Sequence, residues 1–211
     1  MGRSNLAARR GAKANRRKAI VAQKRKAEAF EGTLAGQVAR AADAPIYRCL
    51  LSECLFEAGI GTLLLARGTG AGQLVVGVFL LDTFCLGIKD IVLRPMAAAQ
   101  LDAYLDTLSA TSLLAPVDPA YARKLVRDLT QWSGSLGFKP HADFAMAERL
   151  FGDVDPQTCE TSFEFGHDGK PLYMPGPSES PHLISRRMDQ LSEHLGSGEF
   201  DYIVPVEEAA D

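Results

Sequence analysis

Residues 74–81 read Leu-Val-Val-Gly-Val-Phe-Leu-Leu, an apolar run with no polar alternation. A strand with one face in water alternates apolar and polar residues, whereas an unbroken apolar run of this length is typical of a strand covered on both faces. We therefore expect an interior strand here. Apolar runs of strand length also occupy residues 46–56, 60–67 and 84–93.

The connectors between these runs are short and turn-like. Residues 57–59 are Glu-Ala-Gly, and residues 68–72 are Gly-Thr-Gly-Ala-Gly. Short glycine-containing connectors between strand-length runs indicate antiparallel neighbours. The sequence therefore predicts an antiparallel meander of three to four strands, with 84–93 either the fourth strand or an irregular crossing.

Beyond residue 95 the apolar residues recur at helical spacing. We expect four helices, over residues 97–109, 118–136, 143–151 and 180–195. Asp118 before Pro119 is a strong helix start, because Asp caps a helix and proline suits the first helical position. The glycines and Pro171 between 162–165 and 172–174 predict a late β-hairpin. Its aromatic residues are expected either to pack on the last helix or to form a contact surface; they are Phe163, Phe165 and Tyr173.

Strands first and helices later indicate the α+β class, with helices laid on an antiparallel sheet. We expect a basic N-terminal arm over 1–31, disordered or loosely helical, and a linker or short helix over 32–44. A single α+β domain should follow over 45–196, and an acidic C-terminal tail over 197–211. The chain has 211 residues, enough for one sizeable core.

Charge is divided unevenly between the arm and the body. Residues 2–27 carry ten basic residues and no acidic one, so the arm is +10 while the rest of the chain is −13. A block of like charge stays solvated unless an oppositely charged surface receives it. The basic residues are Arg3, Arg9, Arg10, Lys13, Arg16, Arg17, Lys18, Lys24, Arg25 and Lys26.

The arm predicts a nucleic-acid partner, because lysine and arginine contact phosphates without sequence preference and release condensed counterions. No aromatic residue lies among the ten cations, so base stacking is not supported and a structured or duplex backbone is favoured. The leading hypothesis is a non-catalytic, nucleic-acid-associated accessory protein, with RNA slightly ahead of DNA. Two other interpretations remain open: a solubilising tail, and an arm that lies on the acidic body of its own chain.

Carboxylates at predicted strand and helix ends give an alternative hypothesis, a metal-dependent nuclease or phosphoesterase. Such an enzyme needs two or more carboxylates that converge on Mg²⁺ beside a phosphate. The candidates are Asp82, Asp90, Asp143, Asp153 and Asp155. Aspartate at these places also serves helix caps and turns, which is the more ordinary role. The sequence leaves open whether the protein is an enzyme, and a third hypothesis is a protein-interaction module.

Several other classes lack their sequence signals. No apolar run reaches about 18 residues, so no membrane span is expected. The four cysteines form no CxxC pair and the histidines show no zinc spacing, so no metal or other cofactor is expected under the leading hypothesis. A GxSxG motif and the Lys-Ser/Thr of a P-loop are missing. Buried cysteines and the absence of a recognisable signal peptide predict a cytoplasmic protein.

Overall fold

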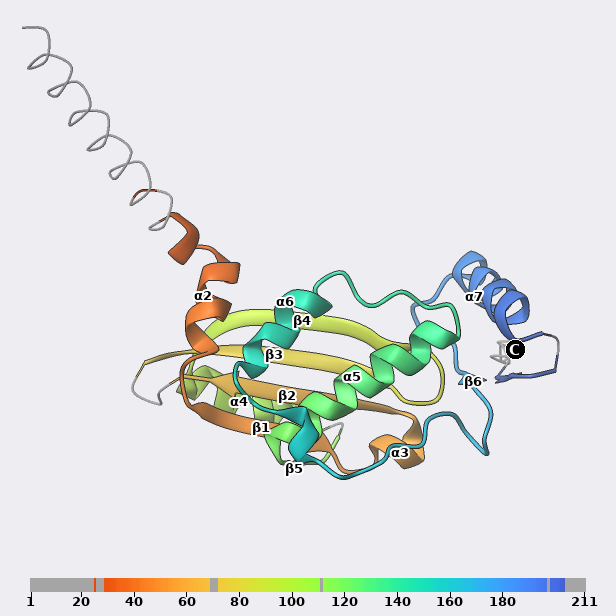
Figure 1. The fold of residues 1–211 in the computed structure, drawn as a ribbon, viewed down its shortest axis with the longest axis horizontal. Helices are drawn as coiled ribbons and strands as arrows, with labels where there is room; N and C mark the ends of the chain where they lie inside the picture. The colour runs from red at the N-terminus through yellow and green to blue at the C-terminus, as the bar shows by residue number, and fades with distance from the viewer. Residues whose placement is uncertain (1–24, 26–28, 69–71, 111, 197, 204–211) are drawn as a thin grey trace, which may run out of the picture.

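The fold is taken from a computed structural model, which describes residues 25, 29–68, 72–110, 112–196 and 198–203. It confirms the α+β class. An antiparallel sheet of five strands in the order β4-β3-β2-β1-β5 forms the centre (Figure 1). The strands are β1 (Ile46–Ser52), β2 (Ile60–Arg67), β3 (Gln73–Asp82), β4 (Gly87–Ala97) and β5 (Leu114–Pro116).

Strand β3 is the interior strand that the unbroken apolar run predicts. It pairs with β2 on one side and β4 on the other, and Phe79 and Leu81 are completely buried. Successive side chains point to opposite faces of a strand, so Phe79 and Val78 enter two different clusters. The sequence from β1 to β4 forms the predicted meander, and 84–93 contributes its fourth strand.

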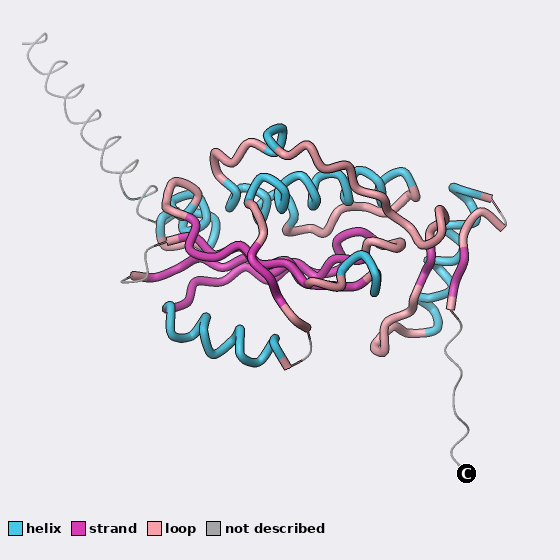
Figure 2. Tube along the Cα trace, turned by 90° about the horizontal axis from the view of Figure 1, so that it is seen from below, coloured by secondary structure: helices cyan, strands magenta, loops and turns pink. Residues whose placement is uncertain are grey.

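Helices cover both faces of this sheet, so the domain has three layers (Figure 2). α2, α5 and α6 pack on one face with the larger cluster, and α4 packs on the other. The helices are α2 (Leu34–Ala41), α3 (Leu55–Ala58), α4 (Ala98–Ser109), α5 (Pro119–Ser135), α6 (Phe144–Glu148) and α7 (Pro181–Leu195), with 3-10 turns η1 (Arg149–Phe151) and η2 (Pro156–Thr158).

Side-chain caps start α5 and α7 where the sequence predicts them. The Asp118 carboxylate accepts from the Ala120 and Tyr121 amides at the start of α5, and the Ser180 hydroxyl accepts from the Leu183 amide in α7. These bonds satisfy amides that have no partner inside their own helix.

α2 is the part of the expected linker that is helical. Thr33 caps it by accepting from the Gly36 amide, and its residues Val38 and Ala41 are buried in the larger cluster. The packed body therefore includes a helix that precedes residue 45.

Two elements differ from the sequence-based expectations. The run at 46–56 is not one strand, because α3 takes its end, and the short strand β5 was not predicted. The predicted late hairpin is present, with a tight turn closed by an antiparallel bridge between His167 and Lys170. The strand after it, β6 (Leu172–Tyr173), pairs in parallel with β7 (Asp201–Tyr202).

A third cluster lies at the end of the sheet occupied by α7, opposite α2 (Figure 1). Tyr173 and Phe200 are buried there against Leu191 of α7. The aromatic residues Phe163 and Phe165 pack elsewhere, against Tyr121 and Trp132 of α5. The expectation of packing on the last helix therefore holds for Tyr173 alone.

Nine of the ten arm cations lie outside the described residues, and so does the expectation that the arm is disordered or loosely helical. Arg25 is described and is exposed. Within the described ranges, no helix combines the length and apolar character that crossing a membrane requires. All four cysteines are free thiols.

Two glycines should respond to alanine with opposite signs. Gly59 has φ +74°, and an added Cβ would lie 2.2 Å from the buried Phe84 ring. Gly59→Ala is expected to lower the free energy of unfolding by roughly 1–2 kcal/mol, through backbone strain and overlap. Gly134 in α5 has open space around it, so Gly134→Ala should raise that free energy by about 0.5 kcal/mol. Urea unfolding of both variants measures the two effects, and equal effects would contradict the assigned backbone geometry.

Candidate functional site

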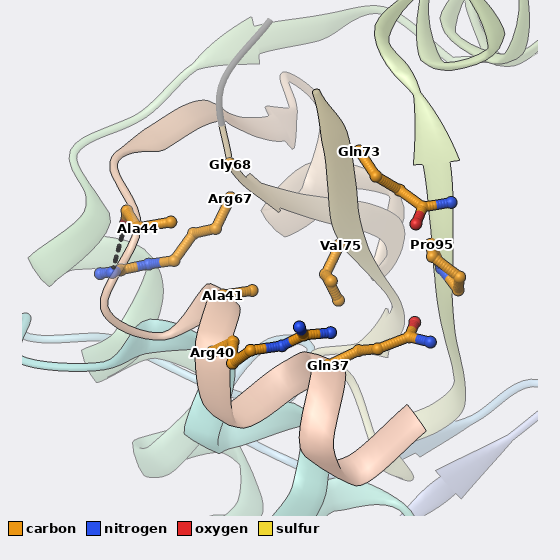
Figure 3. Close-up of a pocket in the computed structure, with 9 residues that line it drawn as sticks. All are labelled: Gln37, Arg40, Ala41, Ala44, Arg67, Gly68, Gln73, Val75 and Pro95. Carbon is orange, nitrogen blue, oxygen red and sulfur yellow. Dashed lines mark hydrogen bonds between the residues drawn. The ribbon is translucent and has the colours of Figure 1, made fainter. Parts of the chain in front are cut away.

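A pocket lined by both polar and apolar residues lies between α2 and one end of the sheet (Figure 3). Its volume is about 410 Å³. Arg67, Val75 and Pro95 lie beside one another across β2, β3 and β4, because the strand register pairs Arg67 with Val75 and Val75 with Pro95. α2 lies across this row. The lining residues are Gln37, Arg40, Ala41, Ala44, Arg67, Gly68, Gln73, Val75 and Pro95.

Arg67 fastens three segments together. The residue shares a strand face with Leu63 and Leu65, so its side chain points to the α2 side of the sheet and is only 3% exposed. Its guanidinium donates to the carbonyl oxygens of Ala42 and Ala44, just after α2, the second at 2.8 Å. It also donates to the Phe151 carbonyl oxygen at 2.7 Å. β2 is thereby tied to the end of α2 and to η1.

The positive charge of Arg67 has little carboxylate compensation. The carboxylate of Asp153 lies 3.6 Å from Nη2, but the Asp153 side chain is 98% exposed. An exposed carboxylate is screened by water and salt, and such pairs contribute little. The guanidinium is instead satisfied by carbonyl dipoles, two of which follow the C-terminal end of α2, the end that favours a cation.

Arg40 and Gln37 come from α2 and extend toward Val75 and Pro95, whereas the guanidinium of Arg67 turns to Ala44 (Figure 3). Arg40 is exposed, and its Nη2 donates to the Glu31 carbonyl oxygen at 3.3 Å. Within the described part of the chain, Gln37 Oε1 and Arg67 Nε are buried without a hydrogen-bond partner. Buried polar atoms are nearly always bonded, so these two need an explanation.

The pocket has the chemistry of an anion site. None of its nine lining residues is acidic, whereas two are arginines and two are glutamines. Arginine binds phosphate and carboxylate oxygens through its planar fork, and amides add neutral hydrogen bonds. The nine lining residues therefore offer positive charge, amide groups and apolar surface to a bound molecule.

A second hollow, of about 570 Å³, lies near α7 and is mostly apolar. Lys89 and Glu179 line it among residues such as Ile60, Leu80 and Pro175. Glu179 is engaged from several sides: Lys89 Nζ donates to Oε1 at 3.2 Å, the Tyr173 hydroxyl donates to Oε2 at 2.5 Å, and Arg187 pairs with Oε2 as well. Because Glu179 already accepts from these groups, it is a structural carboxylate that joins α7 to the sheet.

Asp82 is completely buried at the end of β3. Its Oδ1 accepts from the amides of Phe84 at 3.1 Å and Cys85 at 2.8 Å, so the residue holds the turn between β3 and β4. Burial raises the pKa of this carboxyl to about 6, against the lowering by its backbone hydrogen bonds and by Lys89. Its Oδ2 is buried without a partner among the described residues.

The other four candidate carboxylates lie in separate settings. Asp90 is 62% exposed beside His141, with 3.6 Å between the two groups, and Asp155 accepts from the Gln157 amide in a turn. Asp143 is exposed before α6, and Asp153 is the exposed neighbour of Arg67. In the ranges that the structure describes, no three His, Cys, Asp or Glu side chains gather as metal ligands would. The residues of the metal hypothesis therefore do not form a three-ligand site there.

The sequence reading missed Arg67, Arg40 and Gln37. One signal was present, because Arg67 ends the apolar run of β2. It is two and four residues after Leu65 and Leu63, and residues at this spacing in a strand share a face, here a core face. A charged residue on such a face is rare and points to a special role. Arg40 and Gln37 carried no comparable signal.

The chain was compared with protein-family models, with curated proteins and with solved structures, and none of the three comparisons found a match.

Proposed function

We propose that the chain is a non-catalytic accessory protein of the cytoplasm that associates with nucleic acid through its basic N-terminal segment, residues 2–27, with RNA ahead of DNA. The main support is the separation of charge, +10 in that segment and −13 in the remainder. Ten cations without an intervening carboxylate favour a polyanion, because each phosphate contact releases condensed counterions.

The observation from the fold that carries the proposal is the acid-free pocket beside α2. α2 follows the basic segment in the sequence, and it contributes Arg40 and Gln37 to that pocket. Arg25, the one described cation of the segment, is exposed. A positive charge and an amide on this helix support a partner that carries phosphate.

The proposal predicts binding that weakens steeply with salt. Replacing Arg16, Arg17 and Lys18 by glutamine should reduce the slope of log Kobs against log salt by about 2.7 on duplex DNA, since each phosphate contact contributes about 0.9. Fluorescence anisotropy with a structured RNA and a DNA duplex of equal length, across a salt series, measures both slope and preference.

A matched control removes the same charge elsewhere. Lys139, Arg149 and Arg186 are exposed and lie outside the basic segment, and Arg186 is on α7 at the opposite end of the sheet from α2 (Figure 1). Glutamine at these three positions should leave the slope within about 0.5 of its original value, because they make no phosphate contact. Unchanged binding after deletion of residues 2–27 would refute the proposal.

A further inference from the structure

We infer that the pocket between α2 and the sheet binds the terminal phosphate of a nucleotide, with Arg40 holding the phosphate and Gln37 accepting a hydrogen bond from the sugar or base. The inference deepens the proposed function and rests on it for the class of ligand. The site proposed here is separate from the basic segment. Its ligand is a single nucleotide, whereas the basic segment is proposed to bind the backbone of a long nucleic acid.

The unpartnered atoms indicate that the pocket is built for a ligand. Arg67 is 3% exposed and lines the pocket, yet its Nε donor has no partner among the described residues. Gln37 Oε1, an acceptor, is also buried without a hydrogen-bond partner among the described residues. An unbonded buried polar atom is unfavourable. Gln37 extends along the pocket, so a bound molecule can supply the donor that its Oε1 lacks, whereas the guanidinium of Arg67 turns away to Ala44 (Figure 3).

The charge of the lining residues favours an anion as the bound molecule. Both arginines that line the pocket are cationic at every physiological pH, and no carboxylate lines it. The carboxylate nearest to Arg67, on Asp153, is almost wholly in solvent and is strongly screened. The exposed guanidinium of Arg40 can offer two parallel N–H groups to two phosphate oxygens, the strongest hydrogen-bond arrangement available to it.

The volume of the pocket and the unpartnered acceptor Gln37 Oε1 favour a phosphate that carries an organic group. A volume of about 410 Å³ exceeds what an inorganic anion fills and lies within the range of small-molecule sites. A bare phosphate dianion has no donor for Gln37 Oε1, whereas a ribose hydroxyl or an exocyclic amine has one. Arg40 and Gln73 are exposed, so the pocket opens to solvent at their side chains.

The test is a titration of the full-length chain followed through the side-chain amide signals of Gln37 and Gln73 by ¹H–¹⁵N NMR. The probes are adenosine 5′-monophosphate, adenosine, methyl phosphate, and a hexanucleotide with and without a 5′-phosphate. Adenosine monophosphate should shift the Gln37 signal saturably, and at least tenfold more tightly than adenosine or methyl phosphate. Arg40→Met should weaken that binding about tenfold, because it removes the phosphate-binding fork. Arg186→Met, the same substitution on α7, should leave it unchanged.

The hexanucleotide distinguishes two sources of the same chemistry. Tighter binding of its phosphorylated form assigns the pocket to strand ends, and tighter binding of adenosine monophosphate assigns it to free nucleotides. The inference is overturned if the Gln37 signal does not shift, if Arg40→Met binds as well as the original chain, or if methyl phosphate binds as tightly as the nucleotide. Its failure would leave the salt-dependent anisotropy of the polynucleotide intact, whereas failure of the proposed function abolishes that signal in every variant.

Discussion

Replacement of Arg67 by methionine is expected to lower the free energy of unfolding by about 3–5 kcal/mol. The substitution keeps an unbranched apolar stem but shortens the side chain and removes every donor. Three carbonyl oxygens, those of Ala42, Ala44 and Phe151, then lose the partner that the guanidinium provides. Leaving one buried acceptor unsatisfied costs about 1–3 kcal/mol, and partial access of water limits the sum.

Urea unfolding followed by the fluorescence of Trp132, the single tryptophan, measures this loss. The matched control is Arg40→Met, the same substitution in the same pocket at an exposed position, which should change stability by less than about 0.5 kcal/mol. Arg67→Lys should lie between the two, because one ammonium cannot reproduce the planar fork that serves three carbonyls. Equal stability of the two methionine variants would show that the hydrogen bonds of Arg67 to these three carbonyl oxygens, the Arg67 clamp, contribute nothing to stability.

Replacement of Glu179 by glutamine is expected to cost about 3 kcal/mol at pH 7, because it leaves Lys89 and Arg187 partly buried without their carboxylate. Burial alone would raise the pKa of Glu179. Hydrogen bonds from Tyr173 and Arg187 outweigh it, and the pKa falls from its ordinary 4.5 to about 2. Burial raises the pKa of the Tyr173 hydroxyl to about 12, together with its hydrogen bond to Glu179 and against a lowering by Arg187.

The lowered pKa of Glu179 fixes the pH range in which the effect appears. The folded protein binds this proton more weakly than the unfolded chain, so stability rises with pH across the interval between the two pKa values. The contribution of Glu179 is complete above pH 4.5 and is lost as the pH falls toward 2. The stability gap between the original chain and Glu179→Gln should therefore close over this interval.

Chemical unfolding at a series of pH values tests that convergence. Glu193→Gln is the control, since Glu193 lies exposed on the same helix and should show no gap at any pH. A gap for Glu179→Gln that stays constant from pH 7 to pH 2 would mean that the ionised carboxylate is not what stabilises the network.

The sequence predicted the parts of the fold that depend on local periodicity and capping. The apolar run of β3, the turns around it, and the starts of α5 and α7 at Asp118 and Ser180 are signals carried by neighbouring residues. β5 has three residues, too few for a period, and it is defined by pairing with β1 across a long interval of chain. The parallel pairing of β6 with β7 is likewise a long-range contact.

The candidate site was harder to predict because its chemistry depends on contacts between distant segments. Arg67 reads as the end of a strand, and only the positions of Ala42 and Phe151 show that its guanidinium is used internally. Asp82 reads equally as a turn residue or a metal ligand, and the two amides that it accepts from identify the turn. The charge separation of the chain, in contrast, is visible in the sequence alone.

The Arg67 clamp also has a mechanical consequence. A load on the N-terminal segment reaches the body through α2, and the far end of that helix is fastened by one guanidinium to β2 and η1. Peeling the end of α2 away from β2 would break the two hydrogen bonds that Arg67 donates to Ala42 and Ala44. The C-terminal end of α2 is therefore fastened to β2, and a pull that reaches it passes to the two strands paired with β2 on either side, β1 and β3.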